Sequence, residues 1–80
     1  MQVGDFVKAK DTSTIILWKM DGDSFPTIAV GKADRQDILI VLDTKNLNEK
    51  NVTHRWKRAV HVLMSTGQTG WVGQGWLQRI

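Results

Sequence analysis

The chain of 80 residues has no cysteine, no tyrosine and a single proline. Without cysteine it forms neither disulfides nor thiolate metal sites, so apolar side chains must stabilise a domain this small. No apolar stretch approaches the roughly 18 residues of a membrane-spanning helix. The opening residues, MQVGDFVKAK, lack the apolar core of a secretory signal. We therefore expect no membrane association and a cytoplasmic location.

The chain also has little net charge, with a formal value of only +3 at pH 7. A bias of this size affects solubility and non-specific association rather than fold. It permits an acidic partner without requiring one. Hydrophobic residues make up 41% and charged residues 24% of the chain, which is ordinary for a globular protein, and the length predicts one domain over residues 1–80.

Residues suited to catalysis or metal binding are few. There is no Ser-His-Asp pattern around a recognisable nucleophile and no cysteine nucleophile. His54 and His61 would lie about 23 Å apart on one extended strand, too far to share a metal ion. Asp21 and Asp23 flank a glycine, but the other ligands of a calcium loop are missing. We expect no enzyme activity, no metal site and no cofactor.

The chain is instead rich in short runs of β-branched and aromatic residues, and no segment shows sustained helical periodicity. The continuous apolar run Ile38–Leu42 predicts a central strand covered on both faces, followed by a polar loop over residues 43–53. Gly4-Asp5 predicts a turn into a first strand. The later extended segments are expected at residues 14–20, 25–30, 38–42, 54–65, 71–72 and 76–80.

The C-terminal third contains the clearest hairpin pattern. Apolar residues flank the polar sequence TGQTG, in which Gly67 and Gly70 are predicted to supply the positive φ angles of a tight turn. Gly73-Gln74-Gly75 is too short and too rich in glycine to continue a strand, so we expect an irregular turn before a last strand at the end of the chain.

The segment TGQTGWVGQGWLQ resembles the distal hairpin, 3₁₀ turn and last strand of the SH3 family. The turn glycines, the pair Trp71-Val72 and the step Trp76-Leu77 carry this resemblance. It implies an all-β fold, a small five-stranded and partly open SH3-like barrel, in which residues 14–30 form the long irregular hairpin of that family.

Four tryptophans are more than a domain of this size buries easily, because each indole N–H needs a partner. Some are expected at the surface, where aromatic residues anchor ligands. The resemblance implies that Trp76 lines a ligand groove. Arg58 occupies the position of the second groove tryptophan, and Trp56, two residues earlier on the same strand face, is its stand-in. The alternative is that these indoles pack in the core, which is the expectation for Trp71.

These observations predict a non-catalytic module that binds a protein partner. Its site is expected to contain Trp56 and Trp76, with Trp18 either joining them or packing in the core. Asp21 and Asp23 correspond to what remains of the family's acidic loop. Because unpaired edge strands can pair with a second copy, we expect either a monomer or a weak homodimer.

A basic stretch gives the main alternative function. Basic side chains surround Trp56, an arrangement that holds phosphates while an aromatic ring stacks on a base. Small barrels such as KOW and Tudor-like modules bind nucleic acids or proteins in this way, although a basic strand edge also prevents aggregation. The residues of this predicted nucleic-acid site are Lys50, His54, Arg55, Lys57 and Arg58.

Two further hypotheses about function come from resemblance to known proteins. The type II dihydrofolate reductases share this barrel class, a Gly-Asp opening and a similar Leu-x-Arg-Ile ending, but their Val-Gln-Ile-Tyr stretch has no counterpart here. The chain also resembles small stand-alone barrels of phages, which implies a structural or accessory role in a larger assembly.

Overall fold

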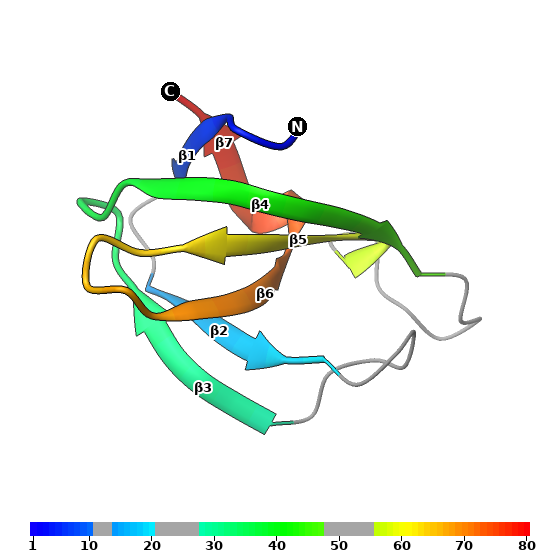
Figure 1. Cartoon of the computed structure of the whole chain (residues 1–80), viewed down its shortest axis with the longest axis horizontal. Helices are drawn as coiled ribbons and strands as arrows, with labels where there is room; N and C mark the ends of the chain where they lie inside the picture. The colour runs from blue at the N-terminus through cyan, green and yellow to red at the C-terminus, as the bar shows by residue number, and fades with distance from the viewer. Residues whose placement is uncertain (11–13, 21–27, 48–55) are drawn as a thin grey trace.

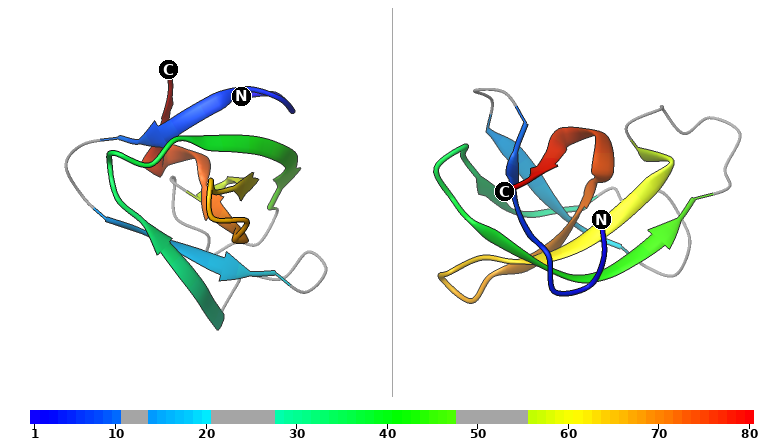
Figure 2. Two further views of the ribbon diagram at one scale, coloured as in Figure 1. Left: turned by 60° about the vertical axis from the view of Figure 1, so that its left-hand side comes forward. Right: turned by 90° about the horizontal axis from the view of Figure 1, so that it is seen from above.

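The computed structural model describes residues 1–10, 14–20, 28–47 and 56–80. These residues form one antiparallel sheet that curls around a core, as the views in Figures 1 and 2 show. The expected all-β architecture is confirmed. In chain order the elements are β1 (Phe6–Ala9), β2 (Ile15–Lys19), β3 (Ile28–Ala33), β4 (Leu39–Asn46), β5 (Arg58–Leu63), β6 (Thr69–Gly73), the 3₁₀ turn η2 (Gln74–Trp76) and β7 (Leu77–Arg79).

The strands lie in the order β3-β2-β6-β5-β4-β1-β7. The described part of the chain therefore has seven strands, whereas five were expected. The difference arises between residues 14 and 33, where a long irregular hairpin was predicted. Here β2 and β3 pair from Ile15↔Ala33 to Lys19↔Ile28, with one register shift between Leu17 and Trp18, and extend the sheet beyond β6. Backbone pairing along this hairpin makes two strands of the segment.

The main core fills the inside of the curl with small and branched side chains. Alternate residues of each strand point inward, as the strand period requires. Leu17, Leu39 and Val62, for example, are completely buried. No tryptophan belongs to this core among the residues described. Its members are Val7, Ala9, Ile15, Leu17, Ala33, Leu39, Val41, Val60, Val62, Val72 and Leu77.

A second apolar cluster contains the aromatic residues. Leu47, Trp56 and Ala59 are buried in it, and the half-buried side chains of Trp18, Met20 and Trp71 pack against it. Ala59 precedes the core residue Val60 on β5, so its side chain points to the opposite face of the sheet. The tryptophans of this cluster, Trp18, Trp56 and Trp71, therefore pack on the outer face of the sheet instead of inside the curl.

The expectation for β4 was wrong in two respects. Leu39 and Val41 are buried, but Ile38 is 55% exposed and Leu42 is 37% exposed, so only one face of the apolar run is covered. The strand also continues through the polar residues to Asn46, which pairs with Arg58 of β5. Pairing with β5 overrides the polar composition, and a register shift after Val41 accommodates the change.

The strand before the distal turn is shorter than predicted. β5 begins at Arg58, and Trp56 lies before it in a 3₁₀ turn. Trp56 and Arg58 therefore do not share one face of a regular strand. The amide of Leu47 donates to the carbonyl of Lys57 over 2.9 Å, which joins the end of β4 to the residue before β5.

The predicted distal turn is confirmed for one of its two glycines. Gly67 has φ of 92°, and its amide donates to the carbonyl of Met64 over 2.9 Å. Gly70 was wrongly placed in the turn, because it lies in β6 opposite Val62 and does not have a positive φ. The turn before β1 is as expected, with Gly4 at φ of 93°.

Within the described ranges, the structure contains no helix with the length and apolar character needed to cross a membrane.

Candidate functional site

Three of the four tryptophans meet at one hollow of about 180 Å³. Trp18 comes from β2, Trp56 from the 3₁₀ turn before β5, and Trp76 from η2. We call this hollow the tryptophan cavity. Its remaining walls are Thr14, Ile15, Ile16 and Val72. Trp56 and Trp76, which were expected to share a site, both line this hollow, and Trp18 joins them, each from a separate element. That the hollow binds a partner stays a prediction.

The cavity lies where β2 separates from the rest of the sheet. β2 pairs with β3 along its whole length, but the register pair that joins it to β6 is Trp18↔Trp71. Toward Ile15 the strand has left β6, and the tryptophan side chains occupy the space that opens beside it. An interrupted strand pairing thus produces a hollow at a seam of the sheet.

The three indoles differ in exposure. Trp56 is 7% exposed and forms part of the second apolar cluster, whereas Trp76 is 36% exposed. Trp18 is half-buried. Trp56 therefore forms the floor of the cavity, and Trp76 presents the most accessible indole to a ligand.

The position of Trp76 is fixed by its backbone. The amide of Lys10, at the end of β1, donates to the carbonyl of Trp76 over 2.8 Å. The amide of Leu77 donates back to Gln74 and closes the 3₁₀ turn. Because both bonds involve the main chain, replacing the indole leaves them intact.

A second hollow, of about 270 Å³, adjoins the first through Trp18. His61 and Trp71 stack along one wall with ring centroids 4.7 Å apart and an interplanar angle of 11°. The ammonium of Lys45 lies 5.6 Å from the centroid of the Trp71 ring, within the range of a cation–π interaction. Lys19 also lines this hollow. The aromatic surface thus continues across three strands and carries cations near it.

The stack changes the acidity of the histidine. Partial burial lowers the pKa of His61 below its ordinary value of 6.5, because desolvation disfavours the imidazolium, and the carboxylate of Asp43 opposes this shift. His61 and Asp43 are cross-strand neighbours on β5 and β4. The neutral form of His61 is therefore the one that the stacked arrangement favours.

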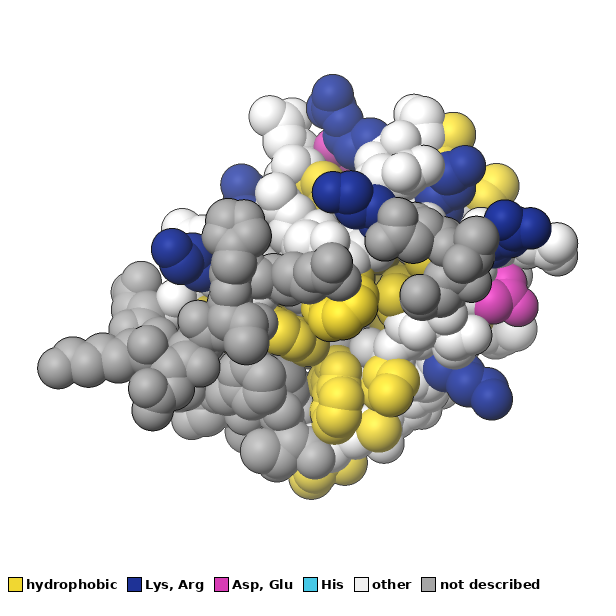
Figure 3. All heavy atoms as spheres, turned by 180° about the vertical axis from the view of Figure 1, so that it is seen from behind, with side chains coloured by type: hydrophobic (Ala, Val, Ile, Leu, Met, Phe, Trp, Pro, Cys, Tyr) yellow, Lys and Arg dark blue, Asp and Glu magenta, His cyan; other side chains and the backbone are white. Residues whose placement is uncertain are grey.

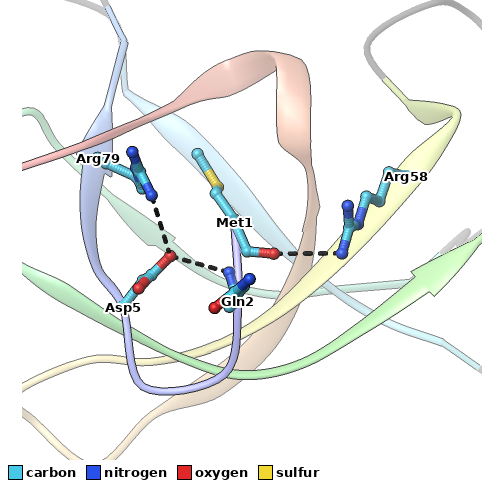
Figure 4. Close-up of polar contacts among 5 residues, drawn as sticks. All are labelled: Met1, Gln2, Asp5, Arg58 and Arg79. Atoms are coloured by element: carbon cyan, nitrogen blue, oxygen red, sulfur yellow. Dashed lines mark hydrogen bonds and ion pairs between the residues drawn. The ribbon is translucent and has the colours of Figure 1, made fainter.

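Arg58 has a structural role in the described part of the chain. Figure 4 shows its guanidinium pointing toward the first residue, where Nη2 donates to the carbonyl of Met1 over 3.2 Å. The same nitrogen lies 3.3 Å from the hydroxyl of Thr44. Asp5 accepts from the amide of Gln2 and lies 4.0 Å from the guanidinium of Arg79 in the same view. Arg58 thereby fixes the N-terminal residues against the end of β4.

The other predicted site residues are only partly covered by the structure. Lys57 is exposed beside Trp56. Asp21 and Asp23 lie outside the described residues, as do Lys50, His54 and Arg55. Among the residues that are described, no group of three or more His, Cys, Asp or Glu side chains is arranged to hold a metal ion.

Sequence reasoning missed the aliphatic walls of the cavity and the stack on Trp71. Ile15, Ile16 and Val72 look like ordinary strand residues, and nothing local distinguishes them. His61 and Trp71 face each other because of the β5–β6 register. That register could have been predicted from the sequence, since it follows from the position of the turn at Gly67.

Comparison of the chain with models of protein families, with curated proteins and with solved structures finds no match.

Proposed function

We propose that this chain is a non-catalytic interaction module of the SH3-like type, and that it binds a protein partner through the tryptophan cavity. The observation that carries the proposal is the convergence of Trp18, Trp56 and Trp76 on one hollow. Tryptophan is enriched among the residues that dominate binding energy in protein interfaces, particularly where it lines a desolvated pocket.

The order of the last elements supports the SH3-like type. Strands β4, β5 and β6 form a meander, η2 follows at once, and β7 returns to pair with β1. This is the arrangement that the resemblance of residues 66–78 to the SH3 family implies. The hairpin β2–β3 occupies the place of the long hairpin expected between the first and second core strands.

The lining of the cavity favours binding over catalysis. The described residues around it carry no titratable side chain, and their polar side-chain groups are the hydroxyl of Thr14 and the indole N–H groups of the tryptophans. General acid–base chemistry needs a side chain that gains or loses a proton within reach of the reacting group. Apolar walls with a few polar contacts suit the capture of an apolar side chain.

A displayed library of random peptides tests the proposal. The wild-type protein is expected to enrich peptides that share a bulky apolar residue, and Trp76→Ala is expected to enrich none. Phe6→Ala is the matched control, because Phe6 is 56% exposed on β1 and does not line the cavity. Circular dichroism establishes that each variant is folded. Equal enrichment by Trp76→Ala and wild type would contradict the proposal, as would no enrichment by wild type.

A further inference from the structure

The tryptophan cavity lies along an edge of β2. Ile15 and Ile16 are consecutive residues of this strand, and Ile15 is 4% exposed whereas Ile16 is 46% exposed. Consecutive strand residues point to opposite faces of a sheet. Both residues nevertheless line the cavity. A hollow that contacts side chains of both faces must lie at the edge of the strand, where the main-chain N–H and C=O groups point.

The opposite walls show the same mixture of faces. Val72, on β6, is buried in the main core, whereas Trp56 belongs to the apolar cluster on the outer face. Both line the cavity together with the two isoleucines of β2. The cavity therefore occupies a gap in the sheet itself, between β2 and the end of β6.

The main chain of β2 is left open along this gap. Within the described ranges, the register between β2 and β6 contains the single pair Trp18↔Trp71, and it does not continue to Ile16 or Ile15. Successive residues of an antiparallel strand direct their N–H and C=O groups alternately to its two edges. One of Ile15 and Ile16 therefore directs both groups toward the gap. Such groups at an open strand edge can pair with another extended chain.

We propose that the partner segment is an extended strand that pairs with this open edge of β2 and inserts one bulky apolar side chain into the tryptophan cavity. This inference rests on the proposed function and adds the conformation of the ligand to it. In recognition by strand addition, main-chain hydrogen bonds supply affinity and pockets for alternate side chains supply specificity. A helix would leave the edge unpaired, because its main-chain groups are already bonded to one another.

The size of the cavity fits one aromatic ring. Its volume is about 180 Å³, and an apolar cavity of about 150 Å³ is large enough to hold benzene. The residues before and after the inserted one point away from the cavity, because side chains alternate along a strand. Apolar surface is also available beside it, since Ile16 is 46% exposed and Figure 3 shows hydrophobic side chains gathering at the centre of one face.

Methylation of the main chain of a model peptide tests the inference. The probe is a fluorescein-labelled peptide with one phenylalanine between two pairs of threonine, since threonine favours an extended chain. One variant is methylated on the amide nitrogen of the phenylalanine, and the other on that of the next threonine. These two N–H groups point to opposite edges of an extended peptide. In anisotropy, one methylation is expected to weaken binding roughly 2- to 12-fold through the lost hydrogen bond, and the other to change it little.

Amide hydrogen exchange locates the segment on the protein. The unmethylated peptide is expected to slow the exchange of one of the two amides of Ile15 and Ile16 and to leave the other comparatively unaffected. The amide of Lys8, on β1 and away from the cavity, is the control for the general stabilisation that any ligand produces. Trp76→Ala is expected to abolish both the binding and the protection. An alanine-rich helical peptide with the same phenylalanine is expected to bind more weakly.

The outcomes separate the two proposals. Binding that is lost in Trp76→Ala but is equally affected by the two methylations would overturn the strand assignment and leave the proposed function standing. Tighter binding of the helical peptide, or failure of the threonine peptide to bind while the displayed library enriches others, would do the same. Absence of any binding that Trp76→Ala removes, for probe and library alike, would overturn both. Protection of Ile15 or Ile16 that grows with protein concentration without peptide would assign the edge to a second copy of the chain instead.

Discussion

Gly70 lies directly against Leu17, so that a Cβ atom built on Gly70 would stand 2.6 Å from the Cβ of Leu17. This contact is where β2 crosses β6, one residue from the pair Trp18↔Trp71. A glycine at this position lets the two backbones approach closely enough for the tryptophans on β2 and β6 to become neighbours.

Gly70→Ala is therefore expected to destabilise the protein by about 1–3 kcal/mol, the usual cost of overpacking a well-packed site. Urea unfolding, monitored by tryptophan fluorescence, measures this loss of stability. Gly31→Ala is the matched control, because the nearest neighbour of its added methyl is the flexible side chain of Gln68 at 3.1 Å. Equal losses in the two variants would show that the contact with Leu17 is not the cause.

Trp56 and Trp76 are expected to respond differently to truncation. Trp56→Ala removes a side chain that is 7% exposed, and replacing a buried tryptophan costs about 3–5 kcal/mol. A domain of this size has a similar total stability, so Trp56→Ala is expected to be largely unfolded. Trp76→Ala removes a side chain that is 36% exposed, so it is expected to lose clearly less stability than Trp56→Ala. Thermal unfolding monitored by circular dichroism compares them, and a folded Trp56→Ala with an unfolded Trp76→Ala would reverse the assignment of floor and rim.

Arg58 is expected to hold the N-terminal residues in place. Arg58→Met keeps the aliphatic stem but removes the bonds to Met1 and Thr44, at a cost of about 1 kcal/mol. Amide hydrogen exchange of Gly4 and Asp5 is expected to accelerate. The control Arg79→Met removes an exposed ion pair of 4.0 Å and is expected to change stability little. Unchanged exchange in Arg58→Met would contradict the role of this guanidinium.

Stability is expected to fall in mildly acidic solution because of His61. Burial against Trp71 makes the pKa of His61 lower in the folded than in the unfolded chain, although Asp43 opposes the shift and Lys45 lies near the same ring. The unfolded chain then binds more protons, so stability rises with pH. The contribution is complete above the ordinary pKa of 6.5 and is lost as the pH falls through the lower folded value.

The measurement is urea unfolding at a series of pH values for wild type and His61→Gln. The variant is expected to show a flatter profile below neutral pH. The difference between the two profiles isolates the contribution of His61. An NMR titration of the imidazole checks the direction of the shift directly, and a folded pKa above the ordinary value would refute the explanation.

The parts of the fold that follow from local chemistry were predictable from the sequence. Gly67 marks the distal turn because a positive φ is inexpensive only for glycine. The run after Gly73 could only make a short turn, and η2 and β7 follow where expected. An excess of tryptophan drew attention to Trp18, Trp56 and Trp76, which share the cavity, and their role in binding stays a prediction.

The features that depend on pairing across the sheet were not predictable in this way. Asn46 has no strand preference and joins β4 only because Arg58 lies opposite it. The local sequence around Gly70 is typical of a turn, whereas the contact that requires a glycine is with Leu17, more than 50 positions away in the chain. The burial of Trp56 likewise depends on Leu47 and Met20, which come from other elements.

The sheet is completed by its first and last strands, since Val7 of β1 pairs with Arg79 of β7 and the amide of Ile80 donates to Phe6. This pairing joins residues that lie far apart in the sequence, so it is among the least local contacts of the fold. Until it forms, β1 is unpaired on that side and Leu77 is missing from the core. Non-local pairings slow folding, so the joining of β7 to β1 is expected to be a late step.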